Sequence, residues 1–506
     1  MKKGKNILQK YAFYVSILVM NIFLRGIVMV TAWTSHGYDK LRLEMTKPAN
    51  ALAEYKVYAA KRETEGFHVA LRSDCDAKDL CININGGNDS VKVQLFHVRG
   101  GVLELDGKKY TDPAVPLGEG ELFDLEADTT MAVLVEFTTS AETEAGEYTY
   151  DISVTDNSGN AVAFARGILH VWNFEMPEKL TFETGVGTNG DPRSISLLRE
   201  HSISGFWSNF DILSDEADAH MSDPRITSFR LEDKFSDEVL VKQHEKLKTN
   251  PEWMKKAFFY VHGLDEPSTI EKLGMFEETY SRLRRLCPGV EIICPFYTDV
   301  QLTEERDQID FMADFVDLHC PKLPMWDDDQ VYSPEQMKKY PPFGERMKAL
   351  QARGDTLWAY VCNIPMAPYL NIKVHEDGIT SRVLFWQHYQ RDIDGFLFWA
   401  GDAWPEDPYH DTDFFHAGWY GDGLLFYPGE PIGLTERVPS IRMKLMRDGI
   451  EDVELLYLAE KLLGREWVDE LVNTVTPTLT SVAVTSDEFA DIRIKIGNAV
   501  EDALSK

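Results

Sequence analysis

The stretch that decides the fold is an apolar run followed at once by polar residues, FFYV at residues 258–261 and HGLDEP at residues 262–267. Four consecutive apolar residues are typical of a short buried strand, and the proline then ends regular structure. Similar runs stand at 291–294, 316–319, 357–361 and 395–399. Longer amphipathic segments at 270–286, 334–352 and 378–391 have the pattern of helices. This alternation predicts a parallel sheet built from βα units.

The size of this region favours a closed barrel. The alternation begins after Met176-Pro177 and runs for about 250 residues, the usual length of a (β/α)8 barrel. An open doubly wound sheet is the alternative, but none of the five apolar runs quoted above is followed by a GxGxxG motif. We therefore predict an α/β TIM-type (β/α)8 barrel over residues 176–435. Residues 436–506 are expected to form a mainly helical segment packed on that barrel.

The residues before the barrel have a different rhythm. Short runs of alternating or continuous apolar residues at 67–71, 91–95, 131–137, 144–152, 161–164 and 168–172 are separated by turn residues. Asn-Ser-Gly-Asn at 157–160 is a hairpin signal. Regular strands without a helical pattern predict an antiparallel β-sandwich over residues 31–175, so the chain is expected to be multidomain.

Residues 1–30 have the pattern of a leader. Four lysines in the first ten residues precede an apolar run at 11–24, which resembles a signal peptide or a membrane anchor. Arg25 ends that run, and fourteen residues are few for a membrane span. Met29 is an alternative start, which would leave the protein in the cytoplasm. We expect a secreted or anchored protein if the leader is used.

Charge and cysteine content exclude some classes of partner. The chain of 506 residues has 83 acidic and 52 basic side chains, a formal net charge of −31. Such a surface repels phosphate backbones and anionic lipids, so we expect no nucleic acid partner and no membrane contact beyond the leader. Cys75 and Cys81 flank a polar loop and would form a disulfide or remain free. The other four cysteines lie in apolar runs typical of buried thiols.

Function in such a barrel belongs at the carboxyl ends of the strands. Aromatic and polar residues gather at the predicted strand ends. Sugar rings stack on aromatic side chains, and their hydroxyls bind polar ones, so the pattern predicts a glycan pocket. The candidate substrate-binding residues are Tyr297, Trp326, Trp358, Tyr360, Asn363, Trp399, Asp402 and Trp404. For some of these residues a structural role is the alternative to substrate binding. Any one Trp would belong to the core, Asp402 would cap a loop, and His262 would be a hydrogen-bonded structural histidine.

Asp265 and Glu266 are the candidate catalytic pair. Glycoside cleavage needs a carboxyl that donates a proton to the leaving oxygen and a group that stabilises the charged sugar centre. Two neighbouring carboxylates serve one site only where the strand opens into its loop, because adjacent strand residues point to opposite faces. The alternative is that Asp265 caps the following helix and that Glu266 is merely exposed.

Residues 407–416 concentrate two histidines and three aspartates. Their spacing fits no zinc signature, and calcium loops usually carry glycine where this segment has aromatics. We interpret the segment as a polar loop over the mouth of the site, and we expect no metal and no cofactor. The sequence does not indicate an oligomeric state.

Several motifs carry a resemblance to a known family. They are residues 262–267, DGFLFW at 394–399, GDGLLFYPG at 421–429 and PSIRMKLMRDGIED at 439–452. Together they resemble glycoside hydrolase family 123 and the C-terminal region of a large related family of uncharacterised proteins. The sandwich domain of that family is resembled upstream by Arg62-Glu63, Phe67 and residues 146–177. Residues 222–229 also resemble the family. The resemblance covers nearly the whole chain after about residue 30.

The resemblance implies a retaining exo-β-N-acetylgalactosaminidase with substrate-assisted catalysis. In that scheme Glu266 is general acid and then general base. Asp265 orients the substrate's 2-acetamido group, whose carbonyl oxygen attacks the anomeric carbon to give an oxazolinium-type intermediate, so no enzyme nucleophile is needed. Tyr297 would hydrogen-bond the acetamido group. Preference for N-acetylgalactosamine is carried over from the family.

Two alternatives to this hypothesis remain. One is a glycosidase of the same fold that acts on another sugar, or that uses the two carboxylates as ordinary acid and nucleophile. The other is a catalytically silent carbohydrate-binding surface protein. If activity depends on the N-acetyl group of the substrate, the first alternative is excluded. Measurable affinity for a sugar without its hydrolysis would indicate the second.

Overall fold

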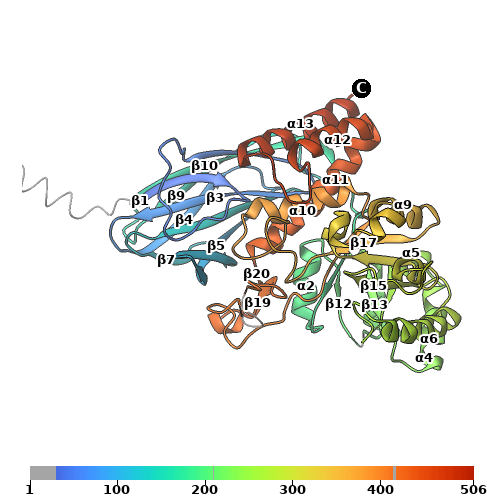
Figure 1. Ribbon diagram of the computed structural model, residues 1–506. Helices are drawn as coiled ribbons and strands as arrows, with labels where there is room; N and C mark the ends of the chain where they lie inside the picture. The colour runs from blue at the N-terminus through green and yellow to red at the C-terminus, as the bar shows by residue number, and fades with distance from the viewer. Residues whose placement is uncertain (1–29, 209, 262, 414–417) are drawn as a thin grey trace, which may run out of the picture.

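The computed structural model describes residues 30–208, 210–261, 263–413 and 418–506 (Figure 1). The predicted leader, His262 and part of the 407–416 segment lie outside the described residues. None of the helices in the described ranges is long and apolar enough to cross a membrane.

The N-terminal part is a sandwich of two five-stranded sheets, with orders β1-β3-β8-β5-β6 and β2-β10-β9-β4-β7. Neighbouring strands pair antiparallel, except that β10 pairs with β2 in parallel. The predicted runs at 161–164 and 168–172 belong to one strand, β10. The strands are β1 (Val30–His36), β2 (Glu54–Lys61), β3 (Thr64–Ser73), β4 (Ala77–Gly86), β5 (Lys92–Leu105), β6 (Lys108–Leu117), β7 (Leu122–Leu125), β8 (Thr130–Thr138), β9 (Gly146–Thr155) and β10 (Ala161–Glu175).

Strand β8 shows why its sequence is almost continuously apolar. Val133, Val135 and Phe137 point into the core between the two sheets, where Phe137 packs on Tyr150 with ring centroids 4.5 Å apart. The alternate residues face the other way, and Leu134 joins the core shared with the barrel. A strand buried on both faces loses the apolar–polar alternation of a half-exposed one.

Eight strands form the second part, and their order β12-β11-β18-β17-β16-β15-β14-β13 makes a nearly closed barrel. All pairs between neighbours are parallel, and β11 pairs with both β12 and β18, so the one open seam lies between β12 and β13. The predicted eight-stranded α/β barrel is confirmed to that extent. The strands are β11 (Glu183–Gly187), β12 (Gly205–Phe206), β13 (Phe229–Leu231), β14 (Ala257–Tyr260), β15 (Glu291–Phe296), β16 (Leu318–Pro321), β17 (Thr356–Tyr360) and β18 (Gly395–Phe398).

Helices connect these strands. The predicted helix 270–286 is α6, and the predicted 378–391 helix is α10, whereas the predicted 334–352 helix is two, α8 and α9. Pro341 and Pro342 separate α8 from α9, because proline has no N–H to donate within a helix. The helices here are α2 (Pro192–Glu200), α3 (Asp215–Ser222), α4 (Asp237–Leu247), α5 (Pro251–Lys256), α6 (Ile270–Leu286), α7 (Gln308–Met312), α8 (Gln336–Lys339), α9 (Phe343–Ala352) and α10 (Gly378–Gln390), with short 3-10 turns η1 (Leu323–Trp326), η2 (Asp328–Gln330) and η3 (Glu430–Ile432).

The C-terminal residues add a short hairpin and three helices. They are β19 (Phe426–Tyr427), β20 (Val438–Pro439), α11 (Ile441–Leu463), α12 (Arg465–Val475) and α13 (Ser486–Leu504). Helix α11 packs against α10, and α13 packs against α11 and β10, so these helices lie along both the barrel and the sandwich (Figure 1).

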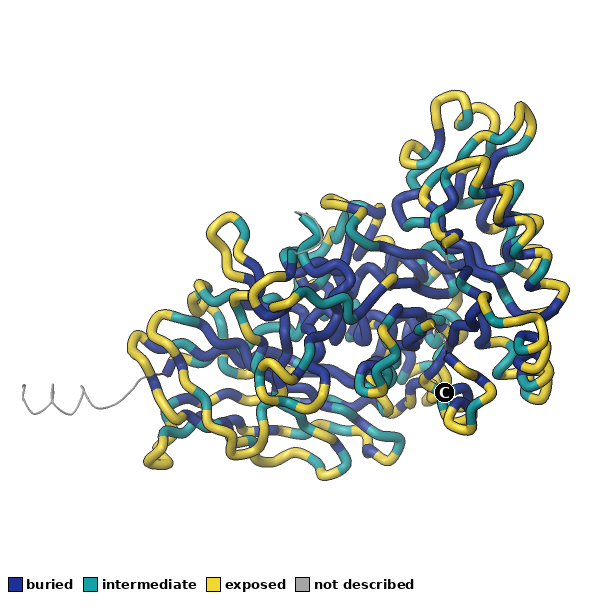
Figure 2. The backbone as a smooth tube through the Cα atoms, turned by 90° about the horizontal axis from the view of Figure 1, so that it is seen from below, coloured by how far each residue is buried: buried dark blue, intermediate teal, exposed yellow. Residues whose placement is uncertain are grey.

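The contact between sandwich and barrel is charged and buried. Glu136 of β8 binds Lys444 at 2.7 Å and Arg447 at 2.8 Å, both on α11. Asp112 of β6 binds Arg442 at 2.8 Å, and neither side chain is exposed. Burial alone would raise the pKa of Glu136, but Arg447 and Lys444 hold it well below its usual range. Buried backbone runs through the middle of the molecule, and the exposed segments lie at its periphery (Figure 2).

Candidate active site

Asp265 and Glu266 lie in the loop between β14 and α6, where the strand has already opened. Glu266 has a left-handed backbone, with φ at 46°, which costs a residue with a side chain on the order of 1 kcal/mol. Helix α6 is capped by Thr269, whose side chain accepts from the Lys272 N–H. The alternative that Asp265 caps this helix is therefore wrong.

The Glu266 carboxylate is held by one of its oxygens. The Tyr360 hydroxyl, from β17, donates a hydrogen bond to Oε1. Lys322 Nζ, just after β16, lies 3.7 Å from the same atom. Among the residues that the structure describes, none hydrogen-bonds Oε2. Oε2 is thus the oxygen left for another molecule.

Asp265 has a different environment. The Tyr260 hydroxyl, at the end of β14, hydrogen-bonds its carboxyl. Asp265 is an exposed residue, but partial burial of its carboxyl raises the pKa. The charge of Glu266 raises that pKa further, and the Tyr260 hydrogen bond lowers it. The two adjacent carboxyls therefore have different partners, as two groups with different roles require.

A cavity of about 650 Å³ opens beside Glu266. Its walls come from the segments that follow four successive strands, β14 to β17, so it lies at the carboxyl end of the barrel. The volume is in the range of pockets for small ligands. The lining residues are Glu266, Tyr297, Lys322, Pro324, Met325, Gln330 and residues 363–369. Of the described residues that line the cavity, Glu266 is the only acidic one.

Tyr297 and Asn363 are the sequence-predicted binding residues that line this cavity directly. Tyr297 follows β15, is 39% exposed and presents its ring to Lys322 Nζ at 4.6 Å. Tyr360 lies deeper, with 6% exposure, and reaches the site through Glu266. The structure therefore places Tyr360 as a partner of the carboxylate rather than as an open wall.

Trp399 stands at the end of β18, next along the barrel. Its indole Nε1 donates to Asp422 Oδ2 at 3.0 Å, and 38% of the residue is exposed. Burial raises the pKa of Asp422 to about 6. Gly423, with φ at 77°, lies under the ring, and a Cβ there would come 2.3 Å from the indole. Asp422 and Gly423 thus fix the ring orientation of a partly exposed Trp.

Two predicted tryptophans lie away from the cavity. Trp358 has no exposed surface, because its indole lies inside the barrel and donates to Glu183 Oε2 at 3.0 Å. Glycine at 395 makes room for it, since a Cβ there would come 2.5 Å from the indole nitrogen. Trp326 packs edge-on against Phe343 of α9, with ring centroids 5.2 Å apart. The expectation that these two rings wall the pocket is corrected: both are packing residues.

Asp402 and Trp404 support neighbouring loops. Asp402 accepts hydrogen bonds from the Thr188 hydroxyl at 2.6 Å and from the Asn189 N–H at 3.1 Å, which joins the loops after β18 and β11. This is the loop-cap alternative. Trp404 Nε1 donates to the Phe426 carbonyl at 2.7 Å, and its ring lies under Arg437. Neither residue lines the cavity.

Sequence reasoning missed Lys322 and Tyr260 as partners of the pair. Lys322 directly follows β16, and Tyr260 ends β14, so their place at a strand end was the signal available. The partnership itself depends on the barrel, which brings the ends of β14, β16 and β17 together.

The thiols and the aspartate-rich segment can also be placed. All six cysteines are free thiols, so Cys75 and Cys81 form no disulfide with each other in this structure. Three of the four thiols predicted to be buried are buried, and Cys362 is partly exposed.

Within the described part of residues 407–416, His410 pairs with Asp407 at 2.9 Å. No group of three or more metal-ligand side chains is found across the described ranges.

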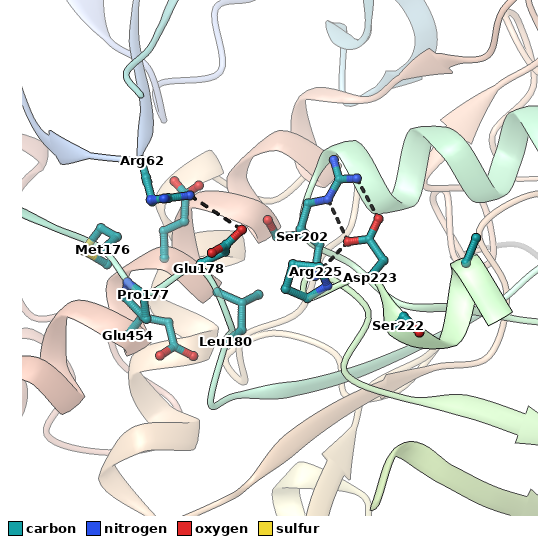
Figure 3. Close-up of a pocket in the computed structure, with 13 residues that line it drawn as sticks. Arg62, Met176, Pro177, Glu178, Leu180, Ser202, Ser222, Asp223, Arg225 and Glu454 are labelled. Carbon is teal, nitrogen blue, oxygen red and sulfur yellow. Dashed lines mark hydrogen bonds and ion pairs between the residues drawn. The ribbon is translucent and has the colours of Figure 1, made fainter. Parts of the chain in front are cut away.

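Figure 3 shows the residues that line a second cavity, of about 510 Å³. Leu180, Ser202 and Pro224 line it and precede β11, β12 and β13, so it is at the amino ends of the strands. Arg62 reaches it from the sandwich and pairs with Glu178 at 3.9 Å. Its described lining includes no aromatic ring on which a sugar could stack. The cavity at Glu266 is therefore the candidate active site.

Comparisons with known proteins concern the family and the fold of the chain. Residues 232–459 match the family described as glycoside hydrolase 123, catalytic domain. The fold is similar to that of a family 123 glycoside hydrolase from Clostridium perfringens, reported for glycolipid glycan hydrolysis, at 12% identity and a TM-score of 0.62 over 94% of this chain and 98% of that one. A family 39 glycoside hydrolase from Bacteroides cellulosilyticus WH2 gives a TM-score of only 0.34 at 12% identity, over 74% and 81% of the two chains. No curated protein matches the sequence. The resemblance read from the sequence motifs is confirmed.

Proposed function

We propose that the chain is a glycoside hydrolase of family 123, as the match of residues 232–459 to that family's catalytic domain supports, and that it removes terminal β-linked N-acetylgalactosamine from glycans with retention of configuration. The catalytic pair in this proposal is Asp265 and Glu266. The observation that carries it is the cavity at Glu266, which opens at the carboxyl ends of four barrel strands.

Glu266 would supply the proton. In the first step Oε2 protonates the glycosidic oxygen while the substrate's own acetamido carbonyl oxygen bonds to the anomeric carbon. The carbon–oxygen bond breaks, its electron pair stays on the leaving oxygen, and an oxazolinium-type intermediate forms. In the second step the Glu266 carboxylate takes a proton from water as that water opens the intermediate. Two displacements at one carbon retain the configuration.

The carboxylate content of the cavity supports a substrate nucleophile. A conventional retaining enzyme needs a second carboxylate at the anomeric centre. Among the described residues, the carboxylate next to Glu266 is Asp265, which does not line the cavity and is engaged by Tyr260. In this proposal the Asp265 carboxylate accepts a hydrogen bond from the acetamido N–H, and a charged acceptor makes such a bond stronger than a neutral one does.

Sugar contacts would come from three predicted residues. Tyr297, which lines the cavity and is 39% exposed, would bind the acetamido group, and Asn363 would bind a ring hydroxyl. Trp399 offers a partly exposed ring with fixed orientation. An oriented aromatic face is what stacking on a sugar requires.

The test compares three 4-nitrophenyl glycosides: N-acetyl-β-galactosaminide, N-acetyl-β-glucosaminide and β-galactoside. We expect hydrolysis of the first above the second, and almost none of the third, which lacks the acetamido group. Asp265→Asn should lower kcat/KM by roughly 10²–10⁴, and Glu266→Gln should do the same on a disaccharide whose leaving group needs protonation. The matched control is Glu271→Gln, an exposed acidic residue on α6, which should behave as wild type.

Three results would count against parts of the proposal. Cleavage of the plain β-galactoside at a comparable rate would contradict substrate assistance. Faster hydrolysis of the N-acetyl-β-glucosaminide would contradict the proposed sugar specificity but leave the proposed mechanism unchanged. Sugar binding without turnover would instead make the chain a carbohydrate-binding protein.

A further inference from the structure

We propose that Lys322 is a positioning residue for Glu266, holding Oε1 together with Tyr360 so that Oε2 is the oxygen that delivers the proton. This inference rests on the proposed acid role of Glu266. It adds a cation to a site for which the sequence pattern indicated carboxylates, aromatic rings and an amide.

The backbone at Lys322 is fixed on both sides. Its N–H donates to the Phe296 carbonyl at 2.8 Å, and it forms a bridge with Tyr360. Lys322 therefore follows β16 in register with the ends of β15 and β17. Its side chain is 11% exposed, so little freedom remains for the ammonium group.

The ammonium group has few partners. It lies over the Tyr297 ring at 4.6 Å and the Tyr360 ring at 5.3 Å, and 3.7 Å from Glu266 Oε1. Among the described residues Glu266 is the only carboxylate that pairs with it. Ring faces attract a cation, but less strongly than a carboxylate does at this distance when water is excluded.

This arrangement acts on the charge that develops in the reaction. When Oε2 passes its proton to the glycosidic oxygen, negative charge appears on the Glu266 carboxylate. The Lys322 ammonium group and the Tyr360 hydroxyl already face Oε1, so they stabilise this negative charge without moving. Contacts that strengthen as the proton leaves stabilise the transition state more than the bound substrate.

The effect should therefore depend on the leaving group. A 2,4-dinitrophenyl group departs with little protonation, whereas a sugar or a 4-methoxyphenyl group needs the proton. Removing Lys322 should slow only the second kind of substrate, because only there does the proton transfer limit the rate. A residue that merely supports the fold would slow both kinds alike.

The experiment measures kcat/KM for Lys322→Met on N-acetyl-β-galactosaminides with these two leaving groups. We expect a loss of roughly 10–100-fold with 4-methoxyphenyl, as part of the general-acid contribution, and about threefold or less with 2,4-dinitrophenyl. Lys322→Arg should recover part of the loss. The matched control is Lys339→Met, whose ammonium also lies 4.6 Å from a tyrosine ring but outside the cavity, and it should equal wild type. Lys322→Gln replaces the Met variant if thermal unfolding shows that variant to be damaged.

Equal losses with both leaving groups, or no loss with either, would overturn the inference. Glu266→Gln measured alongside separates this failure from failure of the proposed function. If Glu266→Gln shows the leaving-group dependence and Lys322→Met does not, only the role of Lys322 is wrong. If Glu266→Gln shows no such dependence, the acid assignment fails and the inference fails with it.

Discussion

Asp112→Asn tests whether the sandwich holds the active-site rim in place. Asp112 accepts from Arg442 Nε and Nη2, both at 2.8 Å, and from the Tyr427 hydroxyl at 2.6 Å. Both charged side chains are fully buried. The substitution leaves the guanidinium of Arg442 without its counter-charge in the interior. Breaking such a pair from one side costs about 3–5 kcal/mol.

That cost converts to a melting shift. At roughly 2.1 cal/mol/K per residue, unfolding a chain of this length has an entropy near 1 kcal/mol/K, so Asp112→Asn should lower Tm by about 3–5 °C. Differential scanning calorimetry measures it. The matched control is Asp124→Asn, whose partner Lys78 lies at the same 2.8 Å but where both side chains are more than half exposed. An exposed pair is worth less than about 1 kcal/mol, so this variant should shift Tm by about 1 °C or less.

The same variant should also change substrate binding. Arg442 donates to the carbonyls of Ile372 at 2.9 Å and Gly421 at 3.0 Å, in the loops after β17 and β18. Those loops carry Lys373 and Asp422 beside the candidate site. We expect KM to rise more than kcat falls. If Asp112→Asn and Asp124→Asn shift Tm equally, the reasoning about buried charge is refuted.

Two further predictions concern the inside of the barrel. Burial raises the pKa of Glu291 from about 4.5 to about 8, so the folded state binds more protons than the unfolded one between those values, and stability should fall as pH rises through that window. Glu291→Gln should remove part of this loss, on the order of 2 kcal/mol at pH 9 and little at pH 5, and equal gains at both pH values would contradict it. Trp358→Phe should cost about 1–3 kcal/mol, because Glu183 loses a buried donor, and calorimetry should show this while kcat stays within about twofold. A large drop in kcat with unchanged Tm would place Trp358 in the site after all.

Periodicity identified the longer elements. The apolar runs at 258–261 and 395–399 correspond to β14 and β18, and the 270–286 segment is α6. Strands β12 and β13 have two and three residues, too few for any period to appear. Their existence follows from barrel closure, which is a property of the whole sheet.

The site shows the same division. The adjacency of Asp265 and Glu266 after a strand was visible in the sequence. What each tryptophan does was less visible: Trp358 lies inside β17 and is fully buried, whereas Trp399 follows the last residue of β18 and is partly exposed. Lys322 was not singled out in the sequence, because its partners Glu266 and Tyr360 come beside it only when the barrel forms.

The left-handed backbone at Glu266 makes the residue proposed for catalysis less favourable for folding stability than glycine would be. Glycine suits a φ of 46° better than any residue with a Cβ, and relieving that strain stabilises a chain by on the order of 1 kcal/mol. Selection for heat resistance alone would thus favour loss of the carboxylate proposed to carry out the reaction. A laboratory evolution that screens survivors of heating without assaying turnover should enrich inactive chains changed at this residue.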